Sequence, residues 1–117
     1  MRCYTYGVFD LLHYGHIRAL KEAKKLADEL IIGVYSDEMA EFFKRKPVLT
    51  QEERIKNIEE LGLGKVILQE FYCPPSTFLK ENKIDIVAKA EGAGWSEHYQ
   101  PYWEGIKSIR NRYENGI

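Results

Sequence analysis

Two histidines three positions apart are the residues of this sequence that point most directly to chemistry. His13 and His16 lie in the stretch GVFDLLHYGHIRALKEAKK, after an apolar run and at the start of an amphipathic segment. At this spacing, two imidazoles can donate hydrogen bonds to one anion from the same side of a helix. Gly15 lets the backbone pass close to a ligand, and the positive end of a helix favours negative charge. The pattern predicts a polyphosphate site in which charge grows on a leaving group.

Two other interpretations of the histidine pair are weaker. A histidine is often a core or surface residue with satisfied hydrogen bonds, but a pair beside a glycine at a helix start is a less ordinary arrangement. A His-x-x-His pair can also ligate zinc, which needs a third ligand, and Asp10 is the local candidate. The phosphate-binding loops G-x-x-x-x-G-K-S/T and G-x-G-x-x-G are absent. The pair therefore predicts a different kind of anion site, with no metal held by the protein.

Composition sets the class of protein. The 117 residues suffice for a single hydrophobic core. A net charge of -1 gives no reason to expect a nucleic-acid partner, which would select a basic surface. No apolar run approaches the roughly 18 residues of a membrane span, so no membrane is expected. The two cysteines, Cys3 and Cys73, have neither metal-ligand spacing nor the number for a disulfide framework, which favours a reducing cytoplasm.

Alternating strands and helices must position the histidine pair. Apolar runs predict strands over 3–9, 30–36, 65–69 and 84–90. Helices are expected over 16–29 and over 37–43, where Ser36 can cap the helix. Two more are expected after a capping box at Thr50 and Glu53 and after the prolines at 74 and 75. Beyond the fourth strand, the aromatic and apolar residues up to Ile109 predict another helix, and no fifth strand is expected.

This order predicts an α/β domain with a Rossmann-like, doubly wound parallel sheet. In such sheets ligands bind beyond the carboxyl ends of the strands. The expected binding crevice is therefore surrounded by residues 7–16, 35–37, 44–47 and 89–95.

The stretch YGVFDLLHYGHIRALKEAKKLADELIIGVYSDE resembles the cytidylyltransferase family, which includes glycerol-3-phosphate, choline-phosphate and ethanolamine-phosphate cytidylyltransferases. The resemblance is strong from Thr5 to Glu38 and looser through KRKPVLTQEERI and IDIVA. The H-x-G-H element defines the wider nucleotidyltransferase superfamily. Leu11, Leu12 and His13 favour the cytidylyltransferase branch, because phosphopantetheine adenylyltransferases read F-D-P with threonine at the position of His13.

The resemblance implies roles for matching positions. His13, His16 and Lys44 would be catalytic, and Lys46 is the near alternative to Lys44 because this loop varies in length. The residues expected to bind the nucleotide, largely through the backbone at the first four, are Gly7, Val8, Phe9, Asp10, Gly15, Lys46 and Arg112. Asp37 and Trp95 are the candidates for contact with the acceptor.

Several of these positions also have plainer explanations. Asp37 can orient the acceptor or Lys44, or it can cap the helix that follows it. Arg54 matches a family arginine but could equally be a charge on a helix surface. Trp95 and the aromatic residues that follow can cage a quaternary ammonium, or they can simply pack against the sheet.

The resemblance implies a single nucleotidyltransferase domain over residues 1–117. It would transfer CMP from CTP to a small phosphorylated acceptor by in-line displacement, with Mg²⁺ carried by the nucleotide, for envelope polymer, capsule or lipid synthesis. Glycerol 3-phosphate is the first choice of acceptor; phosphocholine, phosphoethanolamine or an unusual phosphorylated compound are alternatives, as is ATP for CTP.

Family members are commonly homodimers, so a homodimer is expected. The family ends in R-T-E-G-I-S-T-T, whereas this chain ends in RYENGI, so the C-terminal end is expected to be atypical or truncated. The missing hydroxyl residues leave a non-catalytic nucleotide-binding or regulatory module as an alternative of another class.

Overall fold

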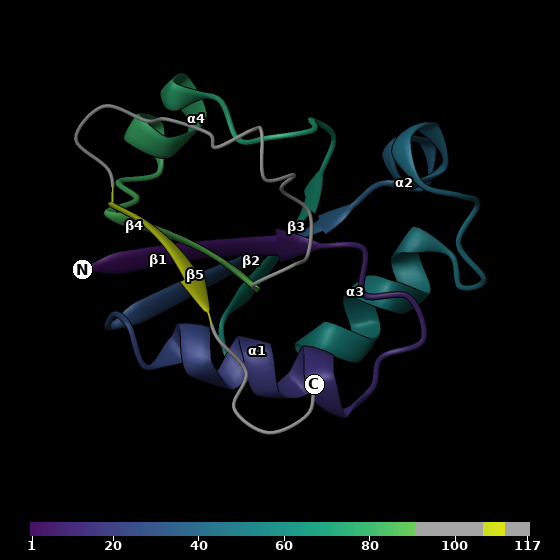
Figure 1. Ribbon diagram of the computed structural model, residues 1–117, viewed down its shortest axis with the longest axis horizontal. Helices are drawn as coiled ribbons and strands as arrows, with labels where there is room; N and C mark the ends of the chain where they lie inside the picture. The colour runs from purple at the N-terminus through teal and green to yellow at the C-terminus, as the bar shows by residue number, and fades with distance from the viewer. Residues whose placement is uncertain (91–106, 112–117) are drawn as a thin grey trace.

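The computed structural model describes residues 1–90 and 107–111, which form a parallel sheet with helices between its strands (Figure 1). In chain order the elements are β1 (Arg2–Gly7), α1 (Tyr14–Lys24), β2 (Glu29–Tyr35), α2 (Asp37–Phe43), α3 (Gln51–Glu59), β3 (Lys65–Gln69), α4 (Ser76–Glu81), β4 (Ile86–Ala90) and β5 (Lys107–Asn111). The strand order is β3-β2-β1-β4-β5, and every neighbouring pair is parallel. The predicted doubly wound α/β sheet is therefore confirmed.

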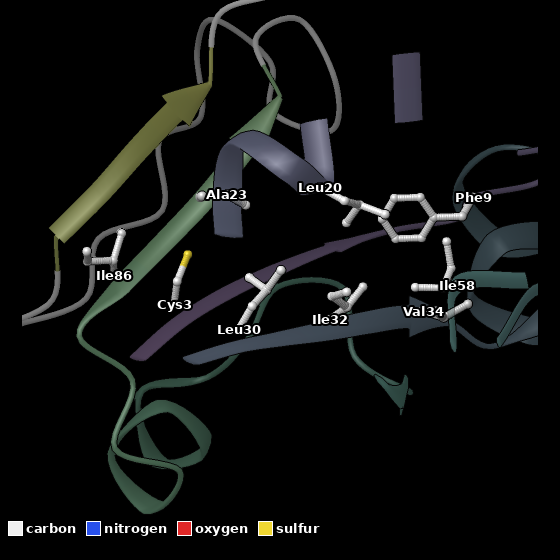
Figure 2. Close-up of a cluster of buried hydrophobic side chains, with 10 residues drawn as sticks. Cys3, Phe9, Leu20, Ala23, Leu30, Ile32, Val34, Ile58 and Ile86 are labelled. Atoms are coloured by element: carbon white, nitrogen blue, oxygen red, sulfur yellow. The ribbon is translucent and has the colours of Figure 1, made fainter. Parts of the chain in front are cut away.

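Helices cover both faces of the sheet, so each face has its own core. On the face of α1 and α3, Leu20 and Ile58 pack on inward side chains of β1, β2 and β4; Figure 2 shows this cluster, with the ring of Phe9 beside Leu20. On the face of α2 and α4, Ala40 and Leu79 pack against a second cluster that contains Tyr4, Tyr6, Ile31, Tyr35, Ile84 and Val87. Burial on both faces explains why the strands read as continuous apolar runs.

The first strand and the first helix are both shorter than expected. β1 ends at Gly7 rather than residue 9, because the chain turns sharply there and Phe9 and Leu11 adopt φ angles of 54° and 50°. α1 begins at Tyr14 and ends at Lys24 rather than near residue 29. Leu26 and Ala27, which extended the helical pattern, pack against the core from the turn that follows. The helical spacing of Leu26 and Ala27 therefore reflected their burial and not a continuation of the helix.

The expectation of a helix through Ile109, with no fifth strand, is wrong. Residues Lys107–Asn111 form β5, which pairs with β4 from Ile86↔Lys107 to Ala90↔Asn111. The backbone N–H and C=O groups on this edge of β4 need partners, and a fifth strand supplies them over its whole length. Tertiary pairing thus decides a segment whose spacing alone suggested a helix.

The predicted start signals of the middle helices are confirmed. The Ser36 hydroxyl accepts a hydrogen bond of 3.2 Å from the Met39 N–H and caps α2. Thr50 and Glu53 form the expected capping box, with hydrogen bonds of 3.0 and 3.2 Å between each side chain and the other's backbone N–H. Of the described helices, none has the length and apolar character needed to cross a lipid bilayer.

Candidate active site

A cavity of about 260 Å³ opens at the carboxyl ends of β1, β2 and β4. Its lining comes from Thr5, Tyr6, Gly7, Val8, Phe9, Asp10, His16, Ala19, Leu20, Tyr35, Phe43, Lys44, Arg45, Pro47 and Lys89. This is the position predicted for the crevice, and it brings together segments separated by up to 84 residues in the sequence, from Thr5 to Lys89. Residues 91–95, which were also expected there, lie outside the described residues, as do Trp95 and Arg112.

The two histidines form the start of α1 with their own side chains. His13 is the N-cap, and its Nδ1 accepts a hydrogen bond of 3.0 Å from the Gly15 N–H. His16 Nδ1 in turn accepts a hydrogen bond of 3.2 Å from the His13 N–H, and the two ring centroids are 4.0 Å apart. The N–H groups of His13 and Gly15 are thus used within the protein. The sequence predicted an anion at the positive end of this helix. At His13 and Gly15, however, the backbone N–H groups donate to the imidazoles of His16 and His13.

These contacts fix the tautomer of both rings. A nitrogen that accepts a hydrogen bond carries no proton, so the ring proton of His13 and of His16 resides on Nε2. Each Nε2–H is therefore available as a donor, and the ring edge of His16 also packs against Phe9, with centroids 5.7 Å apart. The pair presents two oriented donors without any rearrangement of the helix start.

His16 is held neutral. Burial, together with the nearby His13 and the Lys44 ammonium, lowers the pKa of His16 to about 4 and outweighs the opposing effect of Asp10. A neutral imidazole with its proton on Nε2 donates one directed hydrogen bond near pH 7. Bound negative charge would favour the imidazolium form.

Asp10 connects the loop after β1 to the loop after α2. Its carboxylate accepts hydrogen bonds of 2.8 Å from the Val48 N–H and 3.0 Å from the Leu49 N–H. Desolvation alone would raise the pKa of Asp10, but these two bonds and the charges of Arg54 and Arg45 outweigh it and lower the pKa. Asp10 therefore positions the loop that carries Lys44, a contact that the sequence did not reveal.

Lys44 lies in this cavity wall, at the end of α2. Lys44 and His16 both line the cavity, and the charge of Lys44 contributes to the lowered pKa of His16. Lys46, the alternative, is exposed and is not among the residues that line the cavity. His13, Gly15 and Asp37 also lie outside the lining, although His13 is in contact with His16.

Arg54 is a buried residue and not a charge on a helix surface. Its guanidinium donates hydrogen bonds of 2.8 Å to the carbonyl oxygens of Val8 and Tyr35, and one of 3.2 Å to that of Leu49. It also contacts the Asp37 carboxylate at 2.6 Å. The helix cap is Ser36, so the capping role considered for Asp37 is wrong, and its carboxylate serves the arginine.

The ring of Phe9 leaves little room for a side chain at Gly7. A Cβ at this position would lie 3.1 Å from the Cζ atom of Phe9, closer than ordinary van der Waals contact. The group that approaches Gly7 closely is thus the protein's own Phe9 side chain, which packs into the core from the site loop.

Lys89, which the sequence placed only within the expected range 89–95, also lines the cavity. It is 5% exposed, and its ammonium donates a hydrogen bond to the Tyr6 carbonyl oxygen. Burial, with a smaller contribution from Lys44, lowers the pKa of Lys89 to about 7, against an opposing effect of Cys73. A lysine inside the apolar strand IDIVAKA was the signal that could have revealed it.

Comparison with known proteins places this site in a family. A family model described as Cytidylyltransferase-like matches residues 4–114. The chain is 37% identical to choline-phosphate cytidylyltransferase 2 of Arabidopsis thaliana, over 93% of the chain and 38% of that protein. It is 33% identical to choline-phosphate cytidylyltransferase of Saccharomyces cerevisiae, over 100% of the chain and 29% of that protein. The chain thus spans less than two fifths of the length of these two relatives.

Two further matches cover more of the other protein. An FAD synthase of Thermococcus sibiricus is 39% identical over 75% of the chain and 61% of its own length. The crystal structure of a lipopolysaccharide core biosynthesis protein from Thermoplasma volcanium superposes with a TM-score of 0.79 at 29% identity, covering 97% of this chain and 98% of that one. The fold and the sequence matches agree, and the chain belongs to the cytidylyltransferase-like family.

Proposed function

We propose that this chain transfers CMP from CTP to a small phosphorylated acceptor and releases pyrophosphate. The observation that carries the proposal is the histidine pair, whose Nδ1 atoms both accept from backbone N–H groups, which leaves Nε2–H as the donor of each ring. Donors that are fixed before the substrate arrives need no reorganisation when charge develops on a leaving group.

The reaction is a direct displacement. A phosphate oxygen of the acceptor attacks the α-phosphorus of CTP, the bond from that phosphorus to the bridging oxygen of the β-phosphate breaks, and its electron pair leaves with pyrophosphate. His13 and His16 donate to the departing pyrophosphate, while the Lys44 ammonium stabilises charge on the α-phosphoryl oxygens. The protein supplies positions and charge, and no side chain acts as a nucleophile.

The residues present fit a magnesium ion that arrives with the nucleotide. Among the described lining residues Asp10 is the one carboxylate, and both of its oxygens accept backbone N–H groups. The other charged groups of the lining are cations, Lys44, Arg45 and Lys89, so the triphosphate itself would hold the metal. Mg²⁺ would neutralise charge on the triphosphate during transfer.

Glycerol 3-phosphate remains the first acceptor to test, followed by phosphocholine and phosphoethanolamine. The names of the relatives that act on choline phosphate and ethanolamine phosphate support the second and third. The name of the FAD synthase relative is a reason to run ATP alongside CTP.

The test is release of pyrophosphate by the purified chain with CTP, Mg²⁺ and each acceptor. We expect turnover that His16→Ala abolishes and that Lys21→Ala, an exposed change on the same helix, leaves intact. CTP binding without turnover across the acceptor panel would instead identify a non-catalytic nucleotide-binding module. Turnover with ATP alone would change the nucleotide but not the class of reaction.

A further inference from the structure

One wall of the cavity is aromatic. The rings of Tyr6 and Tyr35 meet edge to face with centroids 5.8 Å apart, and those of Tyr35 and Phe43 do so at 4.7 Å. All three residues line the cavity, and they come from β1, β2 and α2. Aromatic faces grouped in this way attract ammonium ions, so the wall is built to hold a cation.

Up to about neutral pH, a cation is already present at this wall and belongs to the protein. Lys89 Nζ lies 4.1 Å from the centroid of the Tyr6 ring and 6.0 Å from that of Tyr35. It is further fixed by its hydrogen bond to the Tyr6 carbonyl oxygen. An ammonium group of a ligand at this wall would lie beside the Lys89 ammonium and be repelled by it.

Among the described residues, no carboxylate forms an ion pair with the buried Lys89 ammonium. Within the part of the chain that the structure describes, the ion pairs are formed by Met1, Arg2, Lys25 and Arg54, and none involves Lys89. Lys44 adds a second positive charge close enough to lower the pKa of Lys89. A buried cation in the lining of a cavity, with no carboxylate paired to it in the described part of the chain, is complementary to an anion that enters with the substrate.

We infer that Lys89 determines acceptor specificity: by occupying the aromatic wall and offering its charge to an anion, it selects a phosphorylated acceptor without an ammonium group, of the polyol phosphate class, and rejects phosphocholine and phosphoethanolamine. This inference rests on the proposed function, because it concerns which acceptor the same site uses. It names a class that differs from the acceptors in the names of the choline and ethanolamine relatives.

The first test uses the unaltered protein. Pyrophosphate release is measured at fixed CTP over a range of glycerol 3-phosphate, phosphocholine or phosphoethanolamine concentrations. We expect kcat/KM for glycerol 3-phosphate to exceed that for either ammonium compound by at least about 100-fold. A preference for an ammonium compound would overturn the inference and leave the proposed transfer standing. No turnover with any acceptor would overturn the proposed function, and the inference with it.

The second test removes the charge and keeps the shape. Lys89→Met should raise KM for glycerol 3-phosphate at least about tenfold, leave KM for CTP within about twofold, and narrow the preference over phosphocholine. Lys80→Met, an exposed change on α4, is the matched control and should change none of these values. Thermal stabilisation of Lys89→Met by added CTP would show that this variant is folded. An unchanged acceptor preference in folded Lys89→Met would overturn the inference.

Discussion

The buried guanidinium of Arg54 contacts the carboxylate of Asp37 at 2.6 Å and, in the same place, the carbonyl oxygens of Val8 and Tyr35. Arg54 belongs to α3, while its partners lie after β1, at the end of β2 and at the start of α2. One side chain thus connects three of the segments that surround the cavity. Arg54 does not line the cavity, so its role is to fix the positions of the segments that do.

We therefore expect Arg54→Met to destabilise the fold. The variant keeps much of the side-chain volume but leaves buried carbonyl oxygens without donors, which should cost roughly 3 kcal/mol of unfolding free energy. Asp37→Asn, which retains an acceptor oxygen, should cost only about 1 kcal/mol. Urea unfolding of both variants measures this difference. A loss for Asp37→Asn as large as that for Arg54→Met would mean that the ion pair, and not the carbonyl contacts, carries the effect.

The neighbouring lysines Lys44 and Lys46 provide a matched pair of substitutions. Lys44→Ala should lower kcat for pyrophosphate release by at least about 100-fold, because it removes a cation directed at the reacting phosphate. Lys46→Ala removes the same charge from the same loop, outside the cavity lining, and should change kcat by less than about threefold. Steady-state kinetics at saturating CTP distinguish the two. The reverse ranking would assign the catalytic role to Lys46.

Gly7 and Phe9 should be energetically coupled. Gly7→Ala places a methyl group 3.1 Å from the ring of Phe9, and displacing that ring should cost about 1–2 kcal/mol of unfolding free energy and weaken CTP binding. Phe9→Leu frees space at the same point, so the double variant should be more stable than the sum of the two single changes predicts. Strict additivity in urea unfolding would show that the ring does not meet the new methyl group.

The buried amine of Lys89 should lower the free energy of unfolding below neutral pH, where it must be buried in its charged form. Its pKa falls from 10.5 when unfolded to about 7 when buried, so between these values the unfolded chain binds more protons and stability rises with pH. The groups that act on it are Lys44 and Cys73, with the rings of Tyr6 and Tyr35 beside it.

Lys89→Met removes this titration. The variant should be more stable than the unaltered protein at pH 6. Its advantage should shrink steadily as the pH rises from about 7 towards 10.5, because over that range the folded chain holds a neutral amine while the unfolded chain still binds the proton. Unfolding free energies at several pH values provide the comparison, in which other titrating groups cancel. A difference that does not depend on pH would show that Lys89 titrates normally.

Local signals in the sequence were sufficient for most of the fold. The capping residues Ser36, Thr50 and Glu53 fixed two helix starts, and the apolar runs fixed β2 and β3 within one residue at either end. The β5 segment was mistaken for a helix, because it becomes a strand by pairing with the edge of β4, and this pairing cannot be read from the spacing of its own residues. Spacing reports which residues are buried and leaves open what they pair with.

Part of the candidate site could likewise be predicted from the sequence, and part could not. The position of the histidine pair and of Lys44 followed from a short motif and from the rule that ligands bind at the carboxyl ends of the strands. The functions of Asp10 and Arg54 did not, because Asp10 depends on backbone groups 38 and 39 residues away and Arg54 on one 46 residues away. Lys89 became notable only when its position over the Tyr6 ring was known.

The strand order has a consequence for how such a protein can diverge. The histidine pair, Asp10, Lys44 and Arg54 all belong to the chain before β3, whereas Lys89 enters from β4, on the other side of the central strand β1. Under the proposed function, natural selection could therefore exchange the residue at the end of β4 while the groups proposed to transfer the nucleotide are inherited unchanged. New acceptors would arise by a few substitutions in a late segment of the gene.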